Sequence, residues 1–131
     1  MIVDTSVLVA IIRNEVEAQR FAMALEKASK SCMSAPNCLE TAVVIDGSRN
    51  ATLSRRLDDV MKDASITIEP VTERQARIAR EAYRDYGKGS GHPARLNFGD
   101  CCAYALARDL AEPLLFKGTH FSHTDVKSAL A

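Results

Sequence analysis

The chain has 131 residues, of which 47% are hydrophobic and 26% charged, and its 17 basic side chains balance 17 acidic ones. This length and composition are ordinary for one globular domain, so we expect a single domain over residues 1–131. A net charge of zero excludes a protein that holds nucleic acid through bulk positive charge alone. No apolar run approaches the roughly 20 residues of a membrane span, and no secretory leader precedes Asp4, so we expect a cytoplasmic protein.

The chain alternates short apolar segments with amphipathic ones. The predicted strands cover residues 2–3, 31–34, 65–69 and 114–116, with residues 125–127 as a further edge strand. The predicted helices cover residues 5–13, 15–30, 35–45, 51–64, 73–86 and 98–110. Strands that alternate with helices predict an α/β fold, with a central, mostly parallel sheet of four to five strands and helices on both sides.

Helix-start signals support several of these boundaries. Thr5 and Ser6 are candidate N-caps of the first helix, and Ser34 is the candidate N-cap before the proline-containing third helix. Thr72 opens a capping-box pattern, and Asn97 is the candidate N-cap of the last helix. Between these last two helices, residues 87–93 predict a flexible, partly basic loop.

The four cysteines, Cys32, Cys38, Cys101 and Cys102, include no Cys-x-x-Cys pair. A chain of this size can bury a sufficient core without crosslinks, so we expect free thiols rather than disulfides. A zinc site built from Cys32, Cys38 and a histidine is the alternative, although its spacing matches no standard zinc pattern.

Three acidic side chains fall where this fold would gather them. Asp4 follows the first strand directly, Glu40 lies one to two turns into its helix, and Asp100 lies in the first turn of the last helix. Functional groups of open parallel sheets collect at the carboxyl ends of the strands. We therefore expect the three carboxylates to point into one crevice.

Three carboxylates in one crevice indicate a divalent metal. Like charges this close raise one another's pKa and resist ionisation unless a cation lies between them. Mg²⁺ and Mn²⁺ prefer oxygen ligands and can activate water against a phosphodiester. Each acid also has a structural alternative: Asp4 can be a helix cap, Glu40 a surface residue, and Asp100 a partner of the helix dipole.

Four segments carry a more specific signal: MIVDTSVLVAII, SAPNCLETAVVI, LNFGDCCAYALA and PLLFKGTHFSHTDV. Together they resemble the PIN-domain ribonucleases, and more narrowly the VapC toxins of bacterial toxin–antitoxin pairs, over nearly the whole chain. The resemblance implies the PIN fold and Mg²⁺- or Mn²⁺-dependent endoribonuclease activity. It also implies that Asp4, Glu40 and Asp100 are the catalytic, metal-binding acids.

The chain departs from the family pattern at one place. Family members often carry a further acid within the segment that reads KGTHF here, where this chain has Thr119 and His120. Thr119 can hold a metal-bound water and His120 can contact metal or phosphate, or both can be plain surface residues. Thr5 or Ser6 can add a hydroxyl near the site. We therefore expect one bound metal rather than two.

The resemblance also implies partners. A cognate VapB-like antitoxin would insert an arginine or lysine among the acids, and the family tends to form homodimers, for which the apolar faces of residues 15–30 and 51–64 are candidate interfaces. For the RNA substrate, Lys88, His92 and Arg95 are candidate phosphate contacts. Aromatic residues make up only 5% of the chain, so we expect the shape of a folded RNA, such as a tRNA, to matter more than base stacking.

Two other functions stay open. A phosphatase or phosphotransferase would use Asp4 as nucleophile, but such enzymes generally need a second aspartate two residues later, and that position is Ser6. A catalytically silent PIN-like module would bind RNA or antitoxin without cutting, and the residues Thr119 and His120 are compatible with it.

Overall fold

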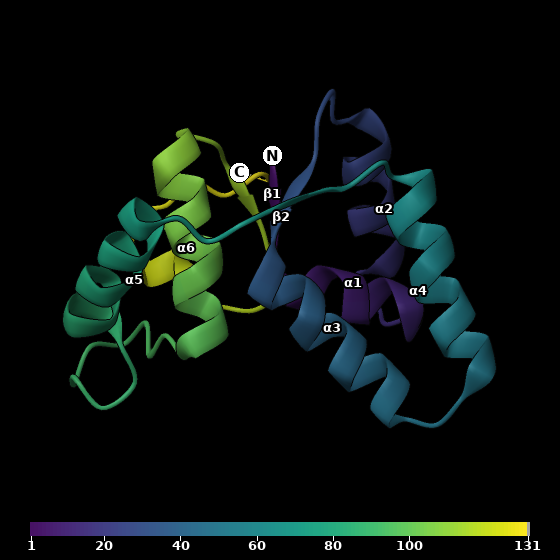
Figure 1. Ribbon diagram of the computed structural model, residues 1–131, viewed down its shortest axis with the longest axis horizontal. Coiled ribbons are helices and arrows are strands. Elements are labelled where there is room, and N and C mark those ends of the chain that lie inside the picture. Colours follow the sequence, from purple (N-terminus) through teal and green to yellow (C-terminus); the bar gives the residue numbers. More distant parts are fainter. Residues whose placement is uncertain (131) are drawn as a thin grey trace.

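The computed structural model describes residues 1–130, and Figure 1 shows a central sheet with helices on both sides. Its four strands are β1 (Ile2–Val3), β2 (Cys32–Ser34), β3 (Thr67–Glu69) and β4 (Leu114–Leu115). Its α-helices are α1 (Thr5–Ile12), α2 (Ala18–Lys27), α3 (Ala35–Gly47), α4 (Ala51–Asp63), α5 (Glu73–Tyr86) and α6 (Phe98–Leu110). All strand pairs are parallel, in the order β3-β2-β1-β4, which confirms the predicted α/β class.

The central strand β1 places Asp4 at the middle of the sheet. Ile2 pairs with Cys32 on one side and with Leu114 on the other. The backbone amide of Asp4 then donates to the carbonyl of Leu115 at 3.0 Å. Asp4 therefore lies at the end of β1, directly beside β4. The chain order reverses at this point, because β2 and β3 lie on one side of β1 and β4 on the other. Such switch points are where open α/β sheets gather functional groups.

Successive side chains of the short strands pack into two different hydrophobic clusters. Ile2 and Leu114 belong to the cluster that includes residues of α6, whereas Val3 and Leu115 belong to the cluster that includes residues of α1, α2 and α4. The alternation follows from the two-residue period of a strand. Figure 1 shows the consequence: α5 and α6 cover one side of the sheet, and α1 to α4 gather on the other.

Several predicted boundaries differ from the structure. The N-cap of α1 is Asp4 and not Thr5 or Ser6, because the Asp4 carboxylate accepts from the backbone amide of Ser6. Ser34 takes the N-cap position of α3, but its side chain makes no capping hydrogen bond in the described part of the chain. The strand predicted from residue 65 begins at Thr67, because Ser65 adopts a left-handed φ of 50°.

One predicted helix is shorter in the structure, and one predicted strand does not form. The helix predicted over residues 15–30 covers only Ala18–Lys27. The predicted edge strand at residues 125–127 is wrong, since no strand forms there and the following residue, Ser128, makes an isolated parallel bridge with Leu114. In that bridge the amide of Leu114 donates to the carbonyl of Lys127 at 2.8 Å. The sheet of residues 1–130 therefore has four strands rather than five.

The cysteines and the hydropathy of the helices match the sequence expectations. All four thiols are free, with three of them buried. Within residues 1–130, no helix is both long and apolar enough to cross a membrane.

Candidate functional site

Asp4 is the buried centre of the site, with only 5% of its surface exposed. One carboxylate oxygen, Oδ2, accepts from the backbone amide of Ser6 at 3.1 Å and from the Ser6 hydroxyl at 2.6 Å. The Ser6 hydroxyl in turn accepts from the backbone amide of Lys117 at 3.0 Å. Ser6 therefore fixes the orientation of Asp4 and ties it to the loop that follows β4.

The ionisation of Asp4 reports which charges surround it. Burial raises the pKa of Asp4 to about 6, and the two Ser6 hydrogen bonds oppose that shift. The negative charges of Asp100 and Glu40 contribute smaller parts of the same upward shift. Asp100 and Glu40 are thus near enough to Asp4 for their charges to act on it, although the three acids come from positions far apart in the sequence.

Glu40 reaches the site by lying over the first turn of α6. A β-carbon added at Gly99 would come within 2.8 Å of both carboxylate oxygens of Glu40. The Glu40 side chain can therefore keep its present position only if residue 99 is glycine. The Asn37 side-chain amide donates to the Gly99 carbonyl at 2.9 Å, one turn earlier on α3. Helix α3 is therefore packed directly against the N-terminal turn of α6.

Asp100 lies at the start of α6, where it acts as part of a helix cap. It completes a capping box, in which the Asn97 side chain accepts from the Asp100 amide at 2.8 Å and Asp100 Oδ2 accepts from the Asn97 amide at 3.1 Å. This geometry fixes the carboxylate at the N-terminus of α6. The same Oδ2 lies 3.3 Å from Nδ1 of His120. The helix-start alternative is thus correct for Asp100 and does not remove it from the site.

The predicted accessory residues divide into three kinds. His120 contacts Asp100 while about half of its side chain, 53%, stays exposed. Thr119 is exposed and makes no side-chain hydrogen bond among residues 1–130. Thr5 makes no side-chain hydrogen bond to the acids among residues 1–130 and donates its hydroxyl to the Asn37 carbonyl at 3.1 Å, so it helps to hold α3.

Sequence reasoning missed Asn37 and the part played by Lys117. Asn37 is fully buried, and its Oδ1 atom has no hydrogen-bond partner among residues 1–130. Such a buried orphan acceptor is uncommon and points to a position kept for function or for contact between elements. The available signal was an amide side chain on the buried face of an otherwise apolar helix turn. The Lys117 amide carries no signal of its own, because its role comes from tertiary packing.

The donor set suits a hard divalent cation, but the side chains form no closed cage. Within residues 1–130, no three His, Cys, Asp or Glu side chains lie close enough together to surround one metal ion. Mg²⁺ needs no such cage, because it keeps several waters and is commonly held by one or two carboxylates plus substrate phosphates. One or two of the carboxylates of Asp4, Asp100 and Glu40 could hold it in that way. Such a cation would offset the repulsion that the charges of Asp100 and Glu40 exert on Asp4.

The predicted RNA-binding loop follows α5. Lys88 and Arg95 are exposed, and Arg95 adopts a left-handed φ of 52°. His92 is half-buried, its Nδ1 accepts from the Ala94 amide at 3.1 Å, and its ring packs edge-on against Tyr86. His92 therefore helps to shape the loop, whereas the two cations are free to meet phosphate.

The central strand of this parallel α/β sheet ends in Asp4 beside two further acids, at the position where open α/β sheets gather functional groups. The PIN domain model matches residues 1–127 of this chain. Ribonuclease VapC28 of Mycobacterium tuberculosis is 55% identical over 130 residues, which span 99% of this chain and 98% of the relative. The chain therefore belongs to the PIN-domain family and, within it, to the VapC ribonucleases, as the sequence motifs predicted.

Two solved structures share the fold at low sequence identity. The crystal structure of Mycobacterium tuberculosis VapC20, described as a sarcin-ricin loop cleaving toxin, has a TM-score of 0.74 and 16% identity, with 95% of each chain covered. A toxin–antitoxin complex from Klebsiella pneumoniae has a TM-score of 0.67 and 20% identity, covering 92% of this chain and 89% of the other. At these identities the likeness concerns the fold alone.

Proposed function

We propose that this chain is a Mg²⁺- or Mn²⁺-dependent endoribonuclease that hydrolyses phosphodiester bonds in RNA and acts as the toxin of a toxin–antitoxin pair. The observation that carries the proposal is the buried Asp4, which faces the charges of Asp100 and Glu40 at the switch point of a PIN fold. An aspartate held where ionisation is costly is more typical of a working site than of a stabilising one.

Each side chain has a distinct part in this reaction. Asp4 binds the cation and is oriented by Ser6, while Asp100 and Glu40 complete the negative pocket from α6 and α3. When bound, the cation supplies Lewis acidity at the scissile phosphate. His120 lies beside Asp100 and is placed to contact a phosphate oxygen of the substrate. Since the fourth acid is absent, we expect one metal to suffice.

RNA would be positioned by the loop between α5 and α6. Lys88 and Arg95 are exposed cations close in sequence to Asn97, which begins the helix of Asp100. Contacts from such side chains to phosphate fix the register of the RNA without reading its bases. We expect a structured RNA, such as a tRNA, whose shape presents one phosphodiester to the acids.

A VapB-like antitoxin would inhibit the enzyme by covering the acids with an inserted cation. An arginine would pair with two of the carboxylates in bidentate geometry and remove their repulsion, much as a metal does. The 55% identity to Ribonuclease VapC28 supports this partner, since it places the chain among the VapC ribonucleases. We further propose a homodimer and a cytoplasmic location.

Cleavage of a structured RNA by the purified protein tests the proposal. With Mg²⁺ or Mn²⁺ the wild type should cut, and cleavage should stop with EDTA and in Asp4→Asn and Asp100→Asn. Either variant cutting RNA at the wild-type rate would refute the metal-site assignment. Circular dichroism of each variant would confirm that the fold survives.

A catalytically silent module is the second candidate. It is favoured by the open arrangement of the acids and by Thr119 and His120 in place of a fourth acid. Binding of RNA without cleavage, under either cation and at several RNA lengths, would support it. Release of phosphate from a phosphomonoester would instead point to a phosphatase with Asp4 as nucleophile.

A further inference from the structure

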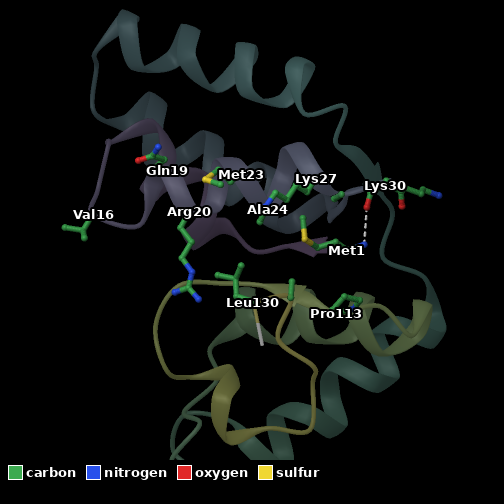
Figure 2. A pocket seen from close by; sticks show the side chains of 13 residues that line it. Met1, Val16, Gln19, Arg20, Met23, Ala24, Lys27, Lys30, Pro113 and Leu130 are labelled. Atoms are coloured by element: carbon green, nitrogen blue, oxygen red, sulfur yellow. Dashed lines mark hydrogen bonds between the residues drawn. The ribbon is translucent and has the colours of Figure 1, made fainter.

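A groove of about 840 Å³ runs along α2 (Figure 2), and none of Asp4, Glu40 and Asp100 lines it. Helix α2 forms one wall, and Met1, Pro113 and the segment of Ala129 and Leu130 form the other. The buried face of α2, which includes Phe21 and Leu25, packs into the core, so the groove uses the opposite, solvent-facing side of this helix.

The groove exposes apolar side chains that the core does not use. Val16 is 98% exposed and Met23 is 45% exposed, and both line the groove. Arg20, Met23 and Lys27 follow one another at spacings of three and four residues, which places them on one face of α2. Figure 2 shows Arg20 reaching from this face toward Leu130, with Met23 and Lys27 further along the helix.

The charges that line the groove all have one sign. Arg20, Lys27 and Lys30 are exposed and, within residues 1–130, none of them forms an ion pair. No aspartate or glutamate of the described residues lines the groove. Because the whole chain is neutral, three unpaired cations along one apolar groove are a local excess and not a general property of the surface.

We propose that this groove binds an acidic amphipathic segment of a partner protein, in which glutamate or aspartate alternates with apolar side chains. Its carboxylates would pair with Arg20, Lys27 and Lys30, and its apolar side chains would cover Met23 and Val16. RNA fits the groove less well. Stacking platforms for single-stranded RNA use aromatic side chains, and no aromatic residue within 1–130 lines it.

The position of the groove gives the partner a route toward the loop behind the acidic site. Arg20 and Leu130 also line a second hollow of about 450 Å³, which reaches Lys117 and Gly118. The Lys117 amide holds Ser6, which in turn holds Asp4. A segment bound along α2 would therefore end beside this loop.

Titration of the ¹⁵N-labelled full chain with two synthetic peptides tests the proposal. Both peptides are about 15 residues long, enough to form a helix when bound. They share leucine at every third or fourth position, and carry either glutamate or lysine at the positions between. We expect the glutamate peptide to shift amide signals of residues 16–30 and 129–130 saturably, and the lysine peptide to bind at least about tenfold more weakly.

Charge reversal provides the matched comparison. The triple variant Arg20→Glu/Lys27→Glu/Lys30→Glu should bind the glutamate peptide with about tenfold or more lower affinity than the wild type does. It should bind the lysine peptide more tightly than the wild type does. As the control, Arg55→Glu/Lys62→Glu/Arg84→Glu makes the same change in net charge at exposed, unpaired cations outside the groove and should bind the glutamate peptide as the wild type does. If the triple variant does not fold, the single variant Arg20→Glu provides the same comparison. Its affinity for the glutamate peptide should fall by about twofold to fivefold.

Five outcomes would overturn the proposal. Four of them are no saturable binding of the glutamate peptide, shifts centred elsewhere, equal loss in the two triple variants, and tighter binding of a single-stranded RNA oligonucleotide at residues 16–30. Concentration-dependent self-association that these same charge reversals abolish would also overturn it, because the occupant would then be a second copy. RNA cleavage is measured on the same variants. A failure of the groove proposal can then be told apart from a failure of the proposed nuclease function.

Discussion

Replacing Asp4 with asparagine should stabilise the metal-free protein at neutral pH while abolishing RNA cleavage. Burial raises the pKa of Asp4 to about 6 in the folded protein, whereas an aspartate in an unfolded chain has a pKa of about 3.9. The folded state therefore holds this proton more tightly than the unfolded state. The resulting stability is complete below about pH 4 and is lost as the pH rises through about 6.

The size of the effect follows from the same two values. One pKa unit corresponds to about 1.4 kcal/mol, so an ionised Asp4 lowers the free energy of unfolding by about 3 kcal/mol at about pH 7.5 without a cation. Asparagine keeps a side-chain oxygen for the hydrogen bonds from Ser6 and carries no charge. Between pH 4 and 7.5, the variant should gain about 1 to 3 kcal/mol relative to the wild type.

Urea unfolding of both metal-free proteins at a series of pH values measures this gain. Taking the difference between the two proteins cancels the titration of groups that they share. Added Mg²⁺ should stabilise the wild type and leave Asp4→Asn nearly unchanged, because ligand binding to the folded state alone raises stability. A difference that stays constant with pH, or that favours the wild type as the pH rises, would refute the reasoning.

Three further substitutions test the rest of the site. Gly99→Ala should displace the Glu40 carboxylate and lower cleavage by about tenfold or more, while the unfolding free energy changes by less than about 1 kcal/mol, since only a flexible side-chain end must move. Ser6→Ala removes the hydroxyl hydrogen bond, one of the two bonds that oppose the raised pKa of Asp4, and keeps the backbone amide bond, so calorimetry should show weaker Mg²⁺ binding whose pH midpoint moves upward. Thr119→Asp should tighten Mn²⁺ binding and raise cleavage if the missing acid limits activity.

Each of these substitutions has its own control or contrary result. Gly47→Ala is the matched control for Gly99→Ala, because a β-carbon there meets no atom within 4 Å, and it should leave cleavage unchanged. Equal activity of both glycine variants would show that Glu40 has no part in cleavage. An unchanged pH midpoint in Ser6→Ala would contradict the hydrogen-bond effect, and unchanged metal affinity in Thr119→Asp would show that His120 or water already fills that position.

The order of strands and helices was predictable because each element has a local signal. The strands are short apolar runs, and two helix starts, at Thr72 and Asn97, form the predicted side-chain caps. The cap of α1 was misassigned because three polar residues stand in a row there. Asp4, the most buried of them, accepts from the amide two residues later.

The three acids could be predicted as a group, but the way they are held could not. Motif and strand position placed Asp4 and Asp100 at the same end of the sheet. The hydrogen bond from the Lys117 amide to Ser6 and the closeness of Gly99 to Glu40 join segments tens of residues apart, and no local pattern encodes them. The charged groove along α2 was also missed, because the helical period of residues 15–30 was assigned to core and dimer contacts alone.

The pairing of the central strand also has a consequence for how the toxin is made. Ile2 lies between Cys32 and Leu114, so the middle of the sheet closes only when residues at opposite ends of the chain meet. Contacts between residues this distant form late, because closing a long loop must precede them. A chain still emerging from the ribosome with α1 to α4 complete lacks Asp100, β4 and the Lys117 loop. Nearly the whole polypeptide would therefore have to be synthesised before its ribonuclease site could form next to the ribosome.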